Sequence, residues 1–151
     1  ISIAQENKDC FIFATDISIK SILVAKQNAA KFYCENIIFL NHDWNNEWLF
    51  PQVDYLISNP PYVDKEATSG KEEGIWHEPE IALFSKDKGL SDLKLILSKG
   101  KNFLNENGKV YLEHAPDQYE ELNKFAMENG YLNFSNLNDL NGDKRVSIYQ
   151  C

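Results

Sequence analysis

The chain has 151 residues, of which 43% are hydrophobic and 25% are charged, with a formal net charge of −8. This balance predicts one compact globular domain, and the lack of a secretory signal or of an apolar run of roughly 20 residues predicts a cytoplasmic location without membrane contact. The negative charge disfavours the phosphates of nucleic acid as a direct partner.

Short apolar runs alternate with a helical pattern in the first part of the chain. "CFIFATD" (10–16) is β-branched and aromatic and predicts a strand. Residues 17–33 carry apolar side chains at roughly helical spacing, and Ser18 is suited to cap that helix. Further strands are predicted over 36–43 and 53–59.

The alternation resumes after a charged stretch without periodicity at 64–74, which predicts a surface loop. This loop is either a lid over a substrate or a solvated excursion. Later patterns predict helices over 89–104 and 116–130, the second with Pro116 early and Gly130 at its end, and strands over 108–114, 131–137 and 145–151. Asn141-Gly142 marks a turn between the last two strands.

This order of elements predicts an α/β fold, with parallel strands, helices on both faces and an antiparallel hairpin at the C-terminal end. In open sheets of this kind, ligands bind outside the carboxyl ends of the strands. Three predicted strands end in polar residues there, so we expect these ends to lie within reach of one small molecule.

Asp16 closes the first predicted strand. In nucleotide-binding sheets an acid at this place accepts hydrogen bonds from both ribose hydroxyls, which would make Asp16 a cofactor-binding residue. Alternatively, its carboxylate helps Ser18 to cap the next helix.

Asp43 and Trp44 follow the second predicted strand. An aromatic plane beside a carboxylate can bind an adenine, because the ring stacks and the acid accepts from the exocyclic amine. Alternatively, Trp44 packs under a surface loop.

"NPPY" (59–62) follows the third predicted strand and is the most specific signal. The two prolines end the strand and leave a stiff elbow with few alternative conformations. Such an elbow presents the side-chain oxygen of Asn59 and the backbone carbonyl of Pro60 as two fixed acceptors, which suit an NH2 group. Tyr62 can then cover the planar face of the amide or base. The alternative is an ordinary turn.

"VDYLISNPPY" resembles the fourth motif of S-adenosylmethionine-dependent methyltransferases that act on planar NH2 groups. Adenine-N6 DNA methyltransferases share this motif with the peptide chain release factor glutamine N5-methyltransferase family. "HEPEIALFSKDKGL", "VYLEHAPDQ" and "NDLNGDKRVSIYQ" look like the E-P-x-x-A-L, L-E-H/I-G-x-x-Q and D-x-x-G-x-x-R segments of the second family. The resemblance runs in order over essentially all 151 residues.

The resemblance implies a Rossmann-like class I methyltransferase sheet, S-adenosylmethionine as cofactor and a release factor as protein partner. The implied cofactor-binding residues are Asp16, Asp43, Trp44 and Asn59. The implied substrate-binding residues are Asn59, Pro60, Pro61 and Tyr62, of which Asn59, Pro60 and Tyr62 would be catalytic. Glu78, Pro79 and Glu113 would support the site.

Some features of the family are missing from this sequence. There is no glycine-rich D-x-G-x-G-x-G loop, no upstream helical domain, and no arginine before the E-P pair in "GIWHEP". "ISIAQENKDC" is similar to the back half of the helix that follows that loop. We therefore expect residues 1–151 to be a partial catalytic domain that lacks the first strand and is inactive alone.

Two other functions stay open at this point. One is a nucleic-acid amino methyltransferase acting on adenine N6 or guanine N2, which would use the same elbow on a flipped base. The other is a non-catalytic domain that keeps the sheet but not cofactor binding. No metal site is expected, because His42, His77 and His114 are far apart and Cys10, Cys34 and Cys151 form no CxxC pair.

Overall fold

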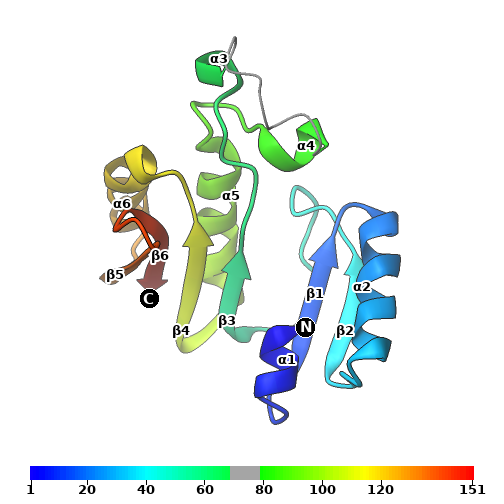
Figure 1. Cartoon of the computed structure of the whole chain (residues 1–151). Coiled ribbons are helices and arrows are strands. Elements are labelled where there is room, and N and C mark those ends of the chain that lie inside the picture. Colours follow the sequence, from blue (N-terminus) through cyan, green and yellow to red (C-terminus); the bar gives the residue numbers. More distant parts are fainter. Residues whose placement is uncertain (69–78) are drawn as a thin grey trace. The chain divides into compact units, whose positions relative to one another are not determined.

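The computed structural model describes residues 1–68 and 79–151, which form two compact units, Ile1–Leu49 and Phe50–Cys151 (Figure 1). Histidine 77, Glu78 and most of the predicted 64–74 loop lie outside the described residues. No helix within the described ranges has both the length and the apolar character needed to cross a membrane.

The first unit is a parallel strand pair with helices. Its elements are α1 (Ser2–Glu6), β1 (Ile12–Asp16), α2 (Ile19–Lys31) and β2 (Ile37–Asn41), with β1 and β2 hydrogen-bonded in parallel (Figure 1). The predicted cap is confirmed, because Ser18 Oγ accepts a hydrogen bond of 3.2 Å from the backbone N–H of Ser21. Buried Ala4, Ala29 and Cys34 form a small core.

The second unit holds a four-stranded mixed sheet. Its strands are β3 (Val53–Ser58), β4 (Leu104–Glu113), β5 (Asn133–Asn138) and β6 (Lys144–Gln150), in the order β3-β4-β6-β5. The pair β3–β4 is parallel, and β6 is antiparallel to both of its neighbours. Only β6 therefore runs against the other three strands, which confirms the mostly parallel sheet with an antiparallel C-terminal hairpin.

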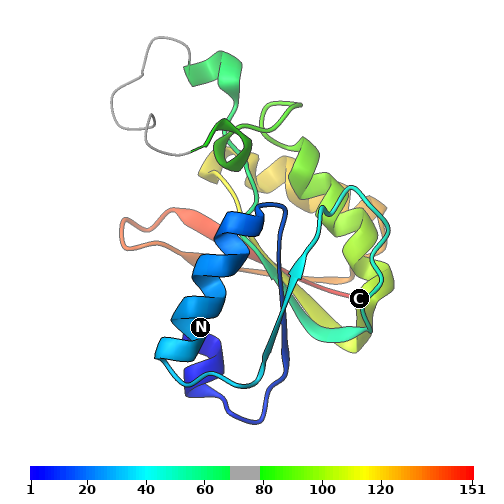
Figure 2. The same cartoon turned by 90° about the vertical axis from the view of Figure 1, so that its right-hand side faces the viewer.

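One face of this sheet carries the core of the second unit. The helices of the second unit are α3 (Lys65–Thr68), α4 (Glu80–Leu83), α5 (Ser91–Gly100) and α6 (Tyr119–Glu128), with 3-10 turns η1 (Lys101–Phe103) and η2 (Pro116–Gln118). The helices α5 and α6 contact each other and lie over β4 and β6 (Figure 2). Val110 and Tyr149 pair in register and are fully buried, while Tyr55 on the other face is 62% exposed. Helices on both faces of one continuous sheet stay a prediction.

The boundary between the fifth helix and the fourth strand differs from the prediction. The apolar periodicity predicts a helix up to Leu104, but α5 ends at Gly100 and Leu104 begins β4, paired with Val53. The pairing of β4 with β3 starts at Leu104, is interrupted by a bulge over residues 105–108, and resumes where Lys109 pairs with Tyr55. Asn107 in this bulge has a left-handed φ of 65°.

Other bounds move by a few residues. The predicted 116–130 helix begins as a 3-10 turn and its α-helical part ends at Glu128, followed by Gly130 with φ 80°. Part of the predicted 64–74 loop is the short helix α3. The turn at Asn141-Gly142 is confirmed, since the N–H of Gly142 donates to Asp139 O at 3.1 Å.

Candidate functional site

The elbow after β3 combines two buried prolines with an exposed asparagine amide. Pro60 and Pro61 are buried, whereas Asn59 is exposed. The Asn59 side chain makes no hydrogen bond to any residue in the described part of the chain. Each proline fixes its own φ angle and restricts the residue before it, so Pro60 limits the backbone of Asn59 and Pro61 limits that of Pro60. The Asn59 amide is therefore held at the strand end and is open to a ligand.

Tyr62 is held at its hydroxyl by two charged side chains. The hydroxyl donates to Glu113 Oε1 at 3.0 Å and accepts from the Arg145 guanidinium at 3.1 Å. Arg145 and Glu113 also form an ion pair of 3.9 Å, and the guanidinium carbon lies 5.5 Å from the centre of the Tyr62 ring. Burial, together with Glu113, raises the pKa of Tyr62 above its ordinary value, and Arg145 opposes this only in part.

Tyr62 is also held at its backbone carbonyl. Gln118 Nε2 donates to Tyr62 O at 2.8 Å and to Lys88 O at 3.0 Å, while Gln118 Oε1 accepts from the N–H of Ala115 at 2.9 Å. Gln118 is only 7% exposed, so one buried amide joins the elbow, the loop before α5 and the end of β4. Gly89 lies in the same place, directly against the Tyr62 carbonyl.

The chain after the elbow pairs with the residues that end α4. The N–H of Val63 donates to Leu83 O at 2.9 Å, and the N–H of Ser85 donates to Val63 O at 3.1 Å. Ser85 Oγ in turn accepts from the backbone N–H of Asp92 in the first turn of α5. The "EPEIAL" segment, from Pro79 on, is thereby connected to the elbow.

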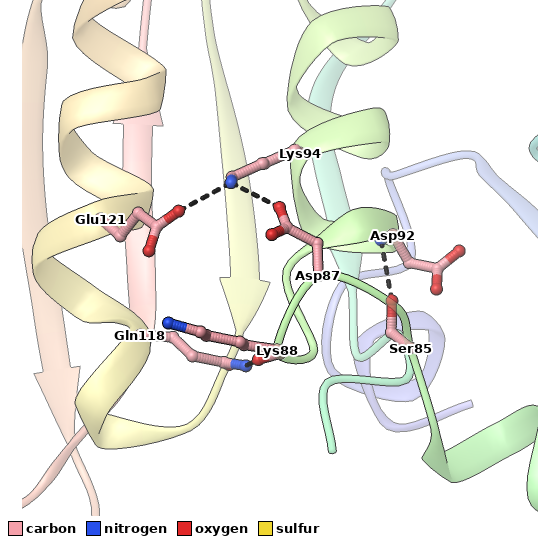
Figure 3. A network of polar contacts seen from close by, with 7 residues as sticks. All are labelled: Ser85, Asp87, Lys88, Asp92, Lys94, Gln118 and Glu121. Atoms are coloured by element: carbon pink, nitrogen blue, oxygen red, sulfur yellow. Dashed lines mark hydrogen bonds and ion pairs between the residues drawn. The ribbon is translucent and has the colours of Figure 1, made fainter. Parts of the chain in front are cut away.

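A strained loop precedes α5 and is held by ion pairs. Asp87, Lys88 and Gly89 have φ angles of 54°, 54° and 82°, three left-handed residues in succession. Lys94 Nζ donates to Asp87 at 2.7 Å and to Glu121 of α6 at 2.8 Å (Figure 3). Burial opposes the charge of Lys94, but the hydrogen bonds to the two carboxylates outweigh it and raise its pKa.

His114 lies next to this site but faces the interior. It is fully buried, with Nδ1 at 2.7 Å from Ala115 O and Nε2 at 2.8 Å from Ser147 Oγ. A carbonyl only accepts, so Nδ1 carries the proton and the Ser147 hydroxyl donates to Nε2 of the neutral ring. Burial lowers the pKa of His114, although its hydrogen bond to Ala115 opposes this. His114 is therefore a structural residue in a neutral state.

In the first unit, Asp16 does what the capping alternative predicts. Its Oδ1 accepts from the N–H of Ser18 at 2.7 Å, and Asn41 Nδ2 holds the backbone there by donating to the carbonyls of Asp16 and Ile17. Asp16 is nevertheless exposed, and its Oδ2 makes no hydrogen bond to the described residues. It can still accept from a ribose hydroxyl.

Asp43 and Trp44 begin a compact turn after β2. Asp43 Oδ1 accepts from the backbone N–H of Asn45 at 2.9 Å and from its side chain at 2.8 Å. Trp48 is the tryptophan buried under this turn, and it donates to Trp44 O at 3.0 Å. Trp44 itself is half-buried.

The structure brings Tyr62 and Glu113 of the second unit together and has three of the four predicted cofactor residues in the first unit. Asp16, Asp43 and Trp44 belong to one unit and Asn59 to the other, so their convergence on one ligand stays a prediction. Sequence reasoning assigned no role to Gln118, Gly89 or Arg145. A signal was present in the sequence, because Gln118 ends the L-E-H/I-G-x-x-Q-like segment "VYLEHAPDQ" and Arg145 ends the D-x-x-G-x-x-R pattern within "NDLNGDKRVSIYQ". In the described part of the chain, no acids, histidines and cysteines gather in a group that could hold a metal ion.

Comparison with known proteins gives consistent matches. Residues 1–78 match the family described as "Methyltransferase small domain". The "Release factor glutamine methyltransferase" of Francisella tularensis is 31% identical over 98% of this chain and 52% of its own length, and the "Bifunctional methyltransferase" of Rickettsia felis is 36% identical over 99% of this chain and 29% of its own length. The chain thus spans about half of the first relative and less of the second.

Among solved structures, a methyltransferase from Pyrococcus furiosus superposes with a TM-score of 0.71 at 18% identity, covering 99% of this chain and 66% of its own. At this identity the match concerns the fold, and it confirms the Rossmann-like class I methyltransferase architecture expected from the sequence.

Proposed function

The chain belongs to the methyltransferase small domain family, and on this premise we propose that it methylates the side-chain amide nitrogen of a glutamine in a peptide chain release factor. The names of relatives such as the Francisella tularensis enzyme, which match nearly the whole chain, support the choice of substrate. Because the chain spans only about half of that relative, we propose the activity for the whole protein.

The elbow carries the proposal. An exposed Asn59 without a hydrogen bond to the described residues stands at the end of β3, on two buried prolines and beside a Tyr62 fixed at both ends. An amide NH2 has two N–H donors and a flat face. The Asn59 oxygen and the Pro60 carbonyl suit the two donors, and the Tyr62 ring suits the flat face.

We assign the cofactor, S-adenosylmethionine, to Asp16, Asp43, Trp44 and Asn59. The residues of the first unit fit such a ligand: Asp16 is exposed and has a carboxylate oxygen, Oδ2, that bonds no described residue and can accept from a ribose hydroxyl, and the indole of half-buried Trp44 is the kind of ring that stacks on an adenine. When bound there, S-adenosylmethionine would supply an electrophilic sulfonium methyl group for transfer to the amide nitrogen, with S-adenosylhomocysteine as the leaving group.

The residues of the elbow act mainly by positioning. An amide nitrogen is a poor nucleophile because its lone pair is delocalised into the carbonyl. Two acceptors, on Asn59 and Pro60, increase the electron density on nitrogen and fix its direction of approach. Positioning of this kind can lower a barrier by about 7–11 kcal/mol.

The proposed mechanism needs no general base from the chain. Tyr62 cannot serve as one, because its proton is donated to Glu113, its oxygen accepts from Arg145, and its pKa is raised. His114 is buried and bonded at both ring nitrogens. The nitrogen becomes cationic when it gains the methyl group, and it then gives its proton to water.

The test is transfer of a labelled methyl group from S-adenosylmethionine to a purified release factor. The 151-residue chain is assayed beside the complete product of its gene, with a release factor that lacks the target glutamine as control. We expect label in the intact release factor and none in the control.

DNA and RNA are offered in the same assay. Label that enters nucleic acid but not the release factor would overturn the proposed protein substrate and favour the nucleic-acid amino methyltransferase. A complete gene product that transfers no methyl group to any of these and binds no S-adenosylmethionine would favour the non-catalytic alternative.

A further inference from the structure

We propose that Glu113, Arg145 and Gln118 are positioning residues that hold Tyr62 at both ends, so that its ring forms a fixed wall of the amide-binding site. This inference rests on the proposed function and extends it to residues that do not touch the substrate. All three lie far along the chain from Tyr62, by 51 residues for Glu113 at the end of β4, 56 for Gln118 in η2 and 83 for Arg145 on β6.

The hydroxyl end is held by two groups with opposite hydrogen-bonding roles. A guanidinium only donates and a carboxylate only accepts, so the Tyr62 hydroxyl must accept from Arg145 and donate to Glu113. This fixes the direction of the hydroxyl hydrogen as well as the position of the oxygen. Both side chains are about one-third exposed, at 31% and 32%, so their charges reach the rim of the site.

The sheet sets the spacing of this pair. Glu113 closes β4 and pairs with Val146 of β6, next to Arg145. The N–H of His114 also donates to Arg145 O at 3.0 Å. The pairing therefore holds the backbones of Glu113 and Arg145 close together at one end of the two strands, and their side chains meet there in the 3.9 Å ion pair at the Tyr62 hydroxyl.

The carbonyl end is held by a side chain whose hydrogen-bonding groups are all used. Both N–H groups of Gln118 donate, to Tyr62 O and Lys88 O, and its oxygen accepts from Ala115. A buried amide satisfied at three points has one orientation. Because the backbone carbonyl and the hydroxyl of Tyr62 are both held, its ring cannot turn about the Cα–Cβ bond without breaking a hydrogen bond.

The experiment compares Arg145→Met, Glu113→Gln and Tyr62→Phe with the parent, and takes Lys144→Met as the matched control. Lys144 is the neighbouring cation on β6, and its Nζ lies 3.4 Å from the centre of the Tyr119 ring rather than at Tyr62. The signal of the Tyr62 ring carbon that bears the hydroxyl is followed by NMR in protein labelled at tyrosine. The kcat and KM for the release factor are measured on the complete gene product.

We expect the Tyr62 signal to shift in Arg145→Met and Glu113→Gln but not in Lys144→Met. In an alkaline titration, Glu113→Gln should lower the pKa of Tyr62 and Arg145→Met should raise it, because the two charges act on the phenol in opposite directions. A general loss of structure would move both variants the same way.

Methyl transfer gives the second readout. A wall that shifts by about 1 Å misplaces the amide, so kcat/KM should fall about 10- to 100-fold in Arg145→Met and in Tyr62→Phe. The double variant Arg145→Met with Tyr62→Phe should lose no more kcat/KM than the more damaging single variant, because both changes break the same hydrogen bond. KM for S-adenosylmethionine should stay unchanged.

Unshifted Tyr62 signals in Arg145→Met and Glu113→Gln, or full activity with shifted signals, would overturn the inference. Multiplicative losses in the double variant would also overturn it. If the unsubstituted protein methylates no glutamine, the proposed function is overturned instead. The NMR signals would still report whether Glu113 and Arg145 hold Tyr62.

Discussion

Gly89 packs directly against the backbone of Tyr62, and a β-carbon at position 89 would collide with the Tyr62 carbonyl oxygen. The same β-carbon would press on the Gln118 amide that bonds this carbonyl. Gly89 also has φ 82°, where a side chain is unfavourable. The loop before α5 therefore reaches the elbow only because residue 89 has no side chain.

The substitution Gly89→Ala should lower the free energy of unfolding by about 2–4 kcal/mol, since it combines a left-handed φ with a backbone collision. Gly142→Ala is the matched control. Gly142 has φ 90°, but a β-carbon there meets no atom of the described residues within 4 Å, so only the conformational cost of about 1 kcal/mol should remain. Urea unfolding of both variants measures the difference, and equal losses would show that the contact with Tyr62 contributes nothing.

Lys94→Met should destabilise the protein more than Lys65→Met. Lys94 is 22% exposed and bonds two carboxylates, Asp87 and Glu121, whereas Lys65 is 62% exposed and, among the described residues, bonds one carboxylate, Glu80. Both acids that bond Lys94 are more than half exposed and screened by water, so we expect a loss of about 1 kcal/mol, against less than about 0.5 kcal/mol for Lys65→Met.

The electrostatic origin of this difference is tested with salt. Thermal unfolding in dilute buffer and in about 1 M sodium chloride should show the gap between the two variants shrinking, because exposed charges are screened at high ionic strength. A gap that is the same in both solutions would contradict an electrostatic origin of the difference.

The local features of this fold could be predicted because single residues decide them. Ser18 caps α2 through its own hydroxyl, and Pro60 and Pro61 end β3 because neither can donate to a ladder. The start of β4 could not be predicted. Leu104 continues the apolar spacing of the preceding helix, and only its pairing with Val53, across the bulge, assigns it to the strand.

The same distinction divides the candidate site. The elbow from Asn59 to Tyr62 is contiguous, so its chemistry can be read locally. The partners of Tyr62 are not contiguous: Gln118 lies 56 residues away and Arg145 lies 83 residues away. A glutamine at a helix start and an arginine in a closing strand have ordinary surface patterns, and only the fold brings them to the tyrosine.

Asn59→Ala should strongly reduce methyl transfer while leaving the fold intact. The side chain is exposed and bonds no described residue, so the free energy of unfolding should change by less than about 0.5 kcal/mol. If the Asn59 oxygen accepts from the reacting amide, kcat/KM should fall at least about 100-fold, as for other site groups that act in the transition state. Asn133→Ala, another exposed asparagine in the same unit, is the control and should keep full activity.

Stability should depend on pH through His114. Its folded-state pKa is lowered from 6.5, first by burial, so below pH 6.5 the unfolded chain takes up a proton that the folded chain does not. The free energy of unfolding should therefore be highest above this pH, fall as the pH drops below it, and stop falling from this cause below the folded-state pKa.

Urea unfolding across this pH range, beside an NMR titration of the His114 ring, measures both quantities. His114→Gln should be less stable at neutral pH by about 1–3 kcal/mol, since buried hydrogen bonds to Ala115 and Ser147 are lost or distorted, but its stability should fall less steeply below pH 6.5. A His114 titration midpoint at or above 6.5 in the folded protein would contradict the neutral buried state, because the charged ring would then be the form that folding favours.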